Sequence, residues 1–261
     1  ASRPRRAKTL AGAVDHLLAL YALDAPWFEK AGLPTTVVGS QALHVDMAGA
    51  DGARFRAARG IAADAPLLLV LPGSRPSEIT RMTPVYEQAV KQLKAQIPGL
   101  EVAVVAAGTV AADVAGRVAA WPFRAHVVQE ADKYDAMKAA DAALATSGTV
   151  TLEVAGAGAP MVIAYKIDGL SYVLMKRLVT AKHITLFNIA ADEAIAPEFI
   201  QHEATPQALA KEVGRLLTDP EVAADQARRQ TEALDLMGRG GPDPSELAAD
   251  AVLRVIAAKA G

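Results

Sequence analysis

Residues 67–75 read Leu67-Leu68-Leu69-Val70-Leu71-Pro72-Gly73-Ser74-Arg75. A continuous apolar run that ends in a Pro-Gly turn predicts a strand buried on both faces, because a half-exposed strand alternates apolar with polar residues. Apolar residues then recur from Ile79 to Ile97 at spacings of one, three and four, which predicts an amphipathic helix. This segment is therefore expected to form a strand, a turn and a covering helix.

The same alternation continues downstream. Further strands are expected at residues 101–106, 126–128, 142–145 and 161–164, with helical segments between them. Strands that alternate with helices predict an α/β fold with a Rossmann-like parallel sheet and helices on both faces. From Pro206 onward the pattern is helical, so we expect a helical C-terminus that ends with residues 244–260.

The beginning of the chain is less regular. Residues 9–20 combine helical periodicity with a short apolar run, residues 25–32 predict a helix, and residues 35–38 predict a strand. The chain also begins without Met and without a signal peptide, as an internal stretch of a longer protein would. We assign residues 1–45 to the remnant of a preceding Rossmann-like domain with its linker, and residues 46–261 to a C-terminal domain.

Composition excludes several classes of protein. The formal net charge is −2, whereas a general nucleic-acid binder carries a basic excess, so no nucleic-acid partner is expected. Without cysteine the chain has neither a disulfide framework nor a cysteine-based metal site. The longest apolar run, residues 65–71, is far shorter than the roughly 18–20 residues that span a bilayer. A cytoplasmic location is expected.

Ligands of open parallel sheets bind where strands end and helices begin, so the turns after the strands are candidate sites. In the first turn, Gly73 permits close approach of the backbone, and Ser74 and Arg75 follow it, with a guanidinium suited to phosphate. The helix that begins near Glu78 is expected to present free N–H groups. An ordinary turn with a solvated arginine is the alternative.

The second candidate turn is Ser147-Gly148-Thr149, between a strand and a helix. Its hydroxyl and N–H groups can bind a diphosphate without lysine or metal. Glu153 follows about one helical turn later, and its carboxylate can accept hydrogen bonds from a ribose. The alternative is helix capping by Ser or Thr, with a glutamate nearby.

Two phosphate-suited turns in one sheet favour a nucleotide site. Neither turn is a Walker loop or a dinucleotide fingerprint, so the diphosphate would be held without a P-loop, which points to nucleotide sugars. Asn188 and Gln201 add amides that can read sugar hydroxyls, although such amides also commonly form turns.

Together these motifs resemble the lipid-A-disaccharide synthase family, over essentially the whole chain. The matching residues are Leu71-Pro72-Gly73-Ser74-Arg75 with Glu78-Ile79, Ser147-Gly148-Thr149 with Leu152-Glu153, Pro160-Met161-Val162 with Tyr165, Asn188-Ile189, and Pro197-Glu198 with Gln201. The resemblance implies the C-terminal half of a GT-B fold, in which two Rossmann-like domains face a cleft. It also implies donor- and UDP-binding roles for Gly73, Ser74, Arg75, Ser147, Gly148, Thr149, Glu153, Asn188 and Gln201.

The reaction implied by the resemblance transfers 2,3-diacylglucosamine from its UDP donor to 2,3-diacylglucosamine 1-phosphate. It yields UDP and a β-1,6-linked disaccharide with inversion at the anomeric carbon, and requires no metal or cofactor. The acceptor site and the carboxylate base of the family would lie upstream of Ala1, so the catalytic residue is unknown. A peripheral place on the inner membrane of a Gram-negative bacterium is implied, and a homodimer is possible.

The chain departs from the family at two places. Gly39-Ser40-Gln41-Ala42-Leu43 stands where the family has Gly-His-Pro-Leu, and Phe187 stands where a proline often precedes the asparagine. The apolar segment 170–179, which includes Lys176-Arg177, could lie on a membrane surface or form a partly buried helix.

Three alternatives remain open at this point. Two are enzymes of the same fold, a UDP-N-acetylglucosamine 2-epimerase and a peptidoglycan-type glycosyltransferase. The third is a non-catalytic UDP-binding module.

Overall fold

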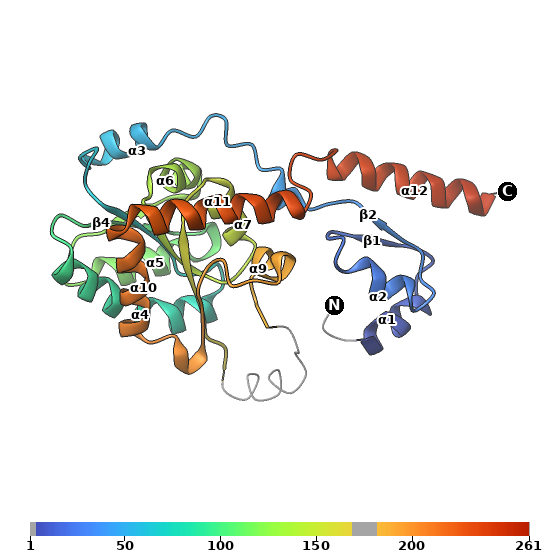
Figure 1. Cartoon of the computed structure of the whole chain (residues 1–261), viewed down its shortest axis with the longest axis horizontal. Coiled ribbons are helices and arrows are strands. Elements are labelled where there is room, and N and C mark those ends of the chain that lie inside the picture. The colour runs from blue at the N-terminus through green and yellow to red at the C-terminus, as the bar shows by residue number, and fades with distance from the viewer. Residues whose placement is uncertain (1–3, 169–181, 261) are drawn as a thin grey trace.

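The computed structural model describes residues 4–168 and 182–260 of the chain. These residues form a six-stranded parallel sheet with helices on both faces and a separate two-stranded sheet near the N-terminus (Figure 1). The Rossmann-like α/β fold expected from the sequence is therefore confirmed.

The large sheet has the strand order β5-β4-β3-β6-β7-β8, and every neighbouring pair is parallel. Its strands are β3 (Leu67–Leu71), β4 (Glu101–Val105), β5 (His126–Val128), β6 (Ala142–Thr146), β7 (Met161–Tyr165) and β8 (Glu198–Ile200). The chain runs outward from β3 to β5, then returns to the other side of β3 and runs outward again. This reversal makes β3 and β6 neighbours, and the gap between their C-terminal ends is the topological switch point at which such sheets bind ligands.

Alternate residues of β3 belong to two separate cores. Leu67, Leu69 and Leu71 pack with helices on one face, and Leu68 and Val70 pack with helices on the other. The first face is covered by α3 (Gly52–Arg59), α6 (Lys133–Ala139), α7 (Val150–Gly156), α9 (Leu186–Ala191) and α11 (Pro220–Leu236). The second is covered by α4 (Pro76–Gln96), α5 (Ala111–Ala119) and α10 (Pro206–Thr218). Burial on both faces is the reason why β3 has no polar residue.

Two elements differ from expectation. The long helix begins at Pro76 rather than near Glu78, because proline is well tolerated in the first turn of a helix. The short strand β8 was not expected from the sequence, since its three half-buried residues have no clear periodicity. It pairs with β7 and extends the sheet by one strand. Short helical turns also follow several strands: η2 (Gly108–Val110), η3 (Glu130–Asp132) and η4 (Gln201–Glu203).

The N-terminal region is a small unit of its own. It contains α1 (Pro4–Ala11), β1 (Leu17–Ala19), α2 (Ala25–Glu29), β2 (Thr35–Val37) and η1 (Gln41–Leu43), with β1 and β2 paired in parallel. The last helix, α12 (Pro244–Ala260), extends from the main body along this unit (Figure 1). Ser245 accepts a hydrogen bond of 2.8 Å from Gln41, and Lys259 pairs with Asp15. The division at residues 45 and 46 remains a prediction.

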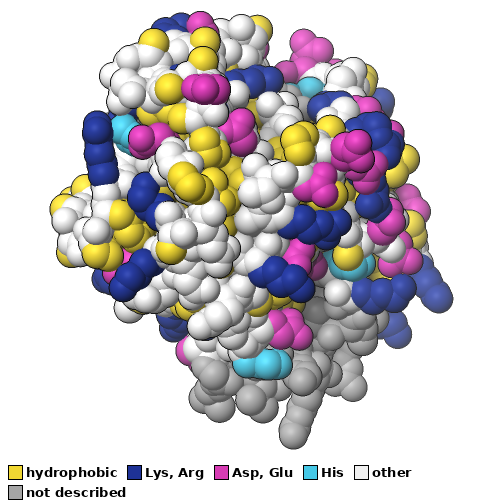
Figure 2. All heavy atoms as spheres, turned by 60° about the vertical axis from the view of Figure 1, so that its left-hand side comes forward, with side chains coloured by type: hydrophobic (Ala, Val, Ile, Leu, Met, Phe, Trp, Pro, Cys, Tyr) yellow, Lys and Arg dark blue, Asp and Glu magenta, His cyan; other side chains and the backbone are white. Residues whose placement is uncertain are grey.

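On the face shown in Figure 2, basic and acidic side chains are interspersed. No helix among the described residues is long and apolar enough to cross a membrane. The segment 170–179, singled out above as a membrane-surface candidate, lies outside the described residues.

Candidate functional site

A polar pocket of about 410 Å³ lies at the switch point between β3 and β6. It brings together the two turns selected from the sequence. Its lining includes Gly73, Ser74 and Arg75 from the first turn, Ser147, Gly148 and Thr149 from the second, and Glu78, Glu130, Lys133 and Glu153 around them. Seven of the nine residues proposed as donor-binding therefore line one pocket.

The first turn is held by Glu78, whose side chain is only 7% exposed. Glu78 Oε2 accepts hydrogen bonds from the backbone amides of Ser74 (3.0 Å) and Arg75 (3.3 Å). Free N–H groups were expected on the helix that begins near Glu78, whereas the two amides of the turn just before it are already capped by this glutamate, as in the reciprocal half of a capping box. An anion at this turn must therefore be bound by the Arg75 side chain.

The Arg75 guanidinium remains accessible. Its Nη1 donates to Glu78 Oε1 at 2.8 Å, yet the Arg75 side chain is 72% exposed. A guanidinium carries five N–H donors, so one bond to Glu78 leaves several for a phosphate.

Gly73 allows this geometry. Its φ of +119° lies in a region that favours glycine, and a Cβ at this position would lie 2.6 Å from Glu78 Oε2. The glycine is thus required both by the backbone conformation and by the close approach of Glu78.

The second turn follows β6, whose last residue, Thr146, is fully buried. Tyr86 of α4 hydrogen-bonds to the Thr146 hydroxyl (3.0 Å), and burial raises the pKa of Tyr86 well above its ordinary value. Thr149 precedes α7 and makes no side-chain cap bond, while the Thr151 hydroxyl donates to the Gly148 carbonyl at 2.7 Å. Thr149 therefore does not cap α7 with its side chain. Gly148 and Thr149 are both exposed to the pocket.

Glu153 lies on α7 with its side chain 15% exposed. Its Oε2 lies 2.9 Å from Lys133 Nζ, which also lies 2.7 Å from Glu130 Oε1. Burial acts to lower the pKa of Lys133, but hydrogen bonding and charge from Glu130 and Glu153 outweigh burial and raise this pKa. Sequence reasoning missed Glu130 and Lys133. Their one sequence signal was their position directly after the strand at 126–128, at the same sheet edge.

The structure does not place Asn188 or Gln201 in this pocket. Asn188 is fully buried on α9, and its amide both donates to and accepts from the backbone of Ala196 (2.9 and 3.1 Å). The Gln201 amide likewise bonds to the backbone of Ile167 in both directions (2.7 and 3.1 Å). Both amides therefore join loops within the fold.

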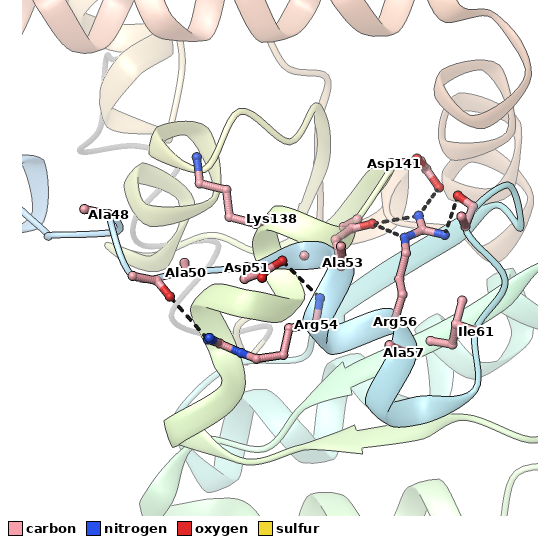
Figure 3. Close-up of a pocket in the computed structure, with 15 residues that line it drawn as sticks. Ala48, Ala50, Asp51, Ala53, Arg54, Arg56, Ala57, Ile61, Lys138 and Asp141 are labelled. Atoms are coloured by element: carbon pink, nitrogen blue, oxygen red, sulfur yellow. Dashed lines mark hydrogen bonds and ion pairs between the residues drawn. The ribbon is translucent and has the colours of Figure 1, made fainter.

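A second hollow of the surface, about 890 Å³, lies elsewhere (Figure 3). It is lined by α3 and the end of α6, next to Asp141 at the N-terminal end of β6. Arg56 and Asp141 are already bonded to each other (2.9 Å), as are Arg54 and Asp135 (2.7 Å). We therefore assign this hollow to the packing of α3 and the switch-point pocket to ligand binding.

Within the described residues, no group of three or more His, Asp or Glu side chains could hold a metal ion. The switch-point pocket itself is lined by two cations, Arg75 and Lys133, and three carboxylates, Glu78, Glu130 and Glu153.

Fold and pocket together define a GT-B-like α/β protein. Two solved structures share the fold over nearly the whole chain. The UDP complex of S. aureus MnaA has a TM-score of 0.64 at 15% identity, covering 95% of this chain and 61% of that one. Sucrose-phosphate synthase from Thermosynechococcus elongatus has a TM-score of 0.59 at 15% identity, covering 98% and 62%.

Sequence comparison is more specific. A family model described as Lipid-A-disaccharide synthetase matches residues 1–252. The lipid-A-disaccharide synthase of Rhodospirillum centenum is 44% identical over 255 residues, and that of Paramagnetospirillum magneticum is 43% identical over 253. The chain belongs to the lipid-A-disaccharide synthase family. It spans 64% and 65% of the length of these two relatives, and they match 97% and 96% of it.

Proposed function

We propose that this chain is the donor-binding part of a lipid-A-disaccharide synthase. The whole protein would transfer 2,3-diacylglucosamine from UDP-2,3-diacylglucosamine to 2,3-diacylglucosamine 1-phosphate, releasing UDP. The observation that carries the proposal is that both family motifs, around Arg75 and around Ser147–Thr149, line one pocket at the switch point.

The charges in the pocket support the roles that we propose. Lys133 is paired with two carboxylates, so the exposed Arg75 is the cation available to the diphosphate. The backbone amides of Gly148 and Thr149 lie ahead of α7 and have no acceptor within it, so they would bind the same phosphates. As the sugar leaves the donor, negative charge grows on the phosphate, and these fixed donors would stabilise it.

Glu153 would accept hydrogen bonds from the ribose hydroxyls. It lines the same pocket as both phosphate-binding turns, from the helix that follows the second turn. The proposal for the whole protein also includes an acceptor site with its general base, a membrane-surface contact and a possible homodimer. It gives the protein a cytoplasmic location, at the inner membrane of a Gram-negative host.

Calorimetry of UDP binding to the chain, with ADP as the control, tests the donor site. Arg75→Ala is expected to weaken UDP binding by about tenfold or more, because a charge-assisted hydrogen bond contributes roughly 1.5–3 kcal/mol. Glu153→Ala should also weaken it. Arg81→Ala, a half-buried arginine on α4 outside the pocket, is the matched control. Normal UDP binding by both Arg75→Ala and Glu153→Ala would refute the assignment.

A transfer assay separates an enzyme from a binding module. The chain is incubated with UDP-2,3-diacylglucosamine and 2,3-diacylglucosamine 1-phosphate, and disaccharide formation is followed by mass spectrometry. UDP binding without turnover is expected if the chain holds the donor half alone. In a parallel incubation with UDP-N-acetylglucosamine followed by NMR, inversion at C2 of the sugar would favour the epimerase alternative.

A further inference from the structure

We infer that Lys133 is a positioning residue, which holds the Glu153 carboxylate so that one of its oxygens meets the ribose of the bound nucleotide. This inference rests on the proposed function, because it assumes that Glu153 accepts from a ribose in this pocket. It adds Lys133, which follows β5 in the chain and lies outside the segments that match the family.

The position of Lys133 follows from the fold. η3 ends at Asp132, and Lys133 is the first residue of α6. The β5 loop and the start of α7 meet at the C-terminal edge of the sheet, so the Lys133 side chain can reach Glu153 across the pocket. Both side chains are largely buried, at 16% and 15% exposure, whereas Glu130 is 52% exposed. The Lys133–Glu153 contact is therefore the shielded half of this three-residue cluster.

The two oxygens of Glu153 are not equivalent. Oε2 is inaccessible to solvent and lies 2.9 Å from Lys133 Nζ, so it cannot meet a ligand. Only Oε1 remains for the ribose. A carboxylate free to rotate would present either oxygen, whereas this ion pair selects one of them before the ligand arrives.

Lys133 also balances charge. Without it, Glu153 would be a mostly buried carboxylate in a pocket that contains Glu130 and Glu78 as well. Removing one partner of a buried ion pair leaves an uncompensated charge, and the remaining side chain then moves or becomes neutral. Either response would spoil a hydrogen bond that requires a fixed, charged acceptor.

Lys133 itself is poorly placed to bind phosphate. Its ammonium is already engaged by two carboxylates at 2.7 and 2.9 Å, and it lies 4.8 Å from the centre of the Tyr134 ring. Its influence on the nucleotide should therefore pass through Glu153.

The ribose contact can be isolated by comparing UDP with 2′-deoxy-UDP. We define the ribose preference as the ratio of the two dissociation constants, measured by calorimetry on the wild-type chain and on Lys133→Met, Lys133→Arg and Glu153→Gln. We expect the wild type to prefer UDP by about tenfold, in line with a hydrogen bond to a charged acceptor. Lys133→Met should reduce the ratio to near one, and Lys133→Arg should retain part of it.

The matched control is Lys138→Met, the same substitution on the same helix, because Lys138 is exposed and lines the hollow at the other end of the strands. In the double variant Lys133→Met/Glu153→Gln, the lysine change should have no further effect, since residues that act through one contact are non-additive. Thermal unfolding of each variant shows that the fold is retained.

The results separate the two proposals. A wild-type chain that is folded but binds no UDP, or shows no ribose preference, overturns the proposed ribose site and this inference with it. A preference that is lost in Glu153→Gln but unchanged in Lys133→Met overturns the inference alone. An additional loss from Lys133→Met in the Glu153→Gln background shows direct contact with the nucleotide and also overturns it.

Discussion

Arg75 and Glu78 form an ion pair of 2.8 Å in which one partner is 72% exposed and the other only 7%. The buried glutamate is fixed by two backbone amides of the turn, Ser74 and Arg75, in addition to the arginine. Glu78 therefore serves as the anchor, and the guanidinium is oriented by it while facing solvent. Orientation before binding reduces the entropy that a ligand must overcome to order the side chain.

Arg75→Lys should weaken UDP binding by about tenfold with little change in stability. A lysine ammonium cannot bond in a planar fork to Glu78 and to a phosphate together, whereas exposed ion pairs contribute only about 0–1 kcal/mol to folding. Calorimetry and urea unfolding measure the two effects. Arg81→Lys, on α4 outside the pocket, is the control. Unchanged UDP affinity in Arg75→Lys would show that charge alone, without the fork, serves the site.

Gly73→Ala should destabilise the chain more than Gly99→Ala. Both glycines have positive φ, +119° and +76°, so both substitutions introduce backbone strain of about 1 kcal/mol or more. Only at Gly73 does the new Cβ approach another atom, Glu78 Oε2, at 2.6 Å, whereas nothing lies within 4 Å at Gly99. The difference between the two free energies of unfolding measures this clash. Equal losses would mean that Glu78 moves aside freely.

Arg56→Met should be destabilising by roughly 1–3 kcal/mol, because it leaves buried backbone carbonyls without a donor, whereas the Asp141 side chain is 49% exposed and stays solvated. The Arg56 guanidinium donates to the carbonyls of Ala139, Ala62 and Ala65. It also pairs with Asp141 (Figure 3).

Arg54→Met is the matched control on the same helix. Arg54 is 60% exposed, and its ion pair with Asp135 should contribute little to stability because solvent screens it. Chemical denaturation compares the two variants, and similar losses would contradict the assignment of Arg56 as the anchor of α3.

The raised pKa of Tyr86 predicts a loss of folding stability at alkaline pH. Burial raises its pKa in the folded state above the ordinary value of 10.0, so the unfolded chain releases this proton first. The neutral tyrosine contributes its full stability below pH 10, and that stability is lost as pH rises above 10. The expected slope is about 1.4 kcal/mol per pH unit for the one proton.

Tyr86→Phe tests this linkage. It removes the hydrogen bond to Thr146 and should lower stability at neutral pH by about 1 kcal/mol. It should also make the loss of stability above pH 10 shallower, because one proton fewer is released on unfolding. Urea unfolding between pH 7 and 11 measures both effects. An equal slope in wild type and variant would show that Tyr86 does not ionise on unfolding in this range.

The local pattern of residues was sufficient for most of the sheet. Leu67–Leu71 could be recognised as a strand because burial on both faces excludes polar residues, and Ile79–Ile97 as a helix because one face must stay apolar. The strand β8 could not be recognised, since its three half-buried residues form a strand only through pairing with β7.

For the candidate site too, some residues could be predicted from the sequence, whereas their arrangement depends on the tertiary structure. Gly73, Arg75 and the turn at Ser147–Thr149 could be proposed from the sequence, because two phosphate-suited turns follow strands of one predicted parallel sheet, although ordinary turns and helix caps use the same residue types. That these turns share one pocket depends on the strand order, which makes β3 and β6 neighbours although about seventy residues separate them. Strand order depends on which surfaces pack together, so it cannot be predicted from a local pattern of residues.

Tertiary structure also determined which polar groups are available. Asn188 and Gln201 have amides suited to a sugar, but each is taken up by backbone groups that the chain brings back to it, those of Ala196 and Ile167. Lys133 had no distinguishing neighbour in sequence, yet it lies between Glu130 and Glu153. Residue type states which bonds a side chain can make, and only the folded chain determines its partners, because a buried polar group bonds to whatever packing places within reach.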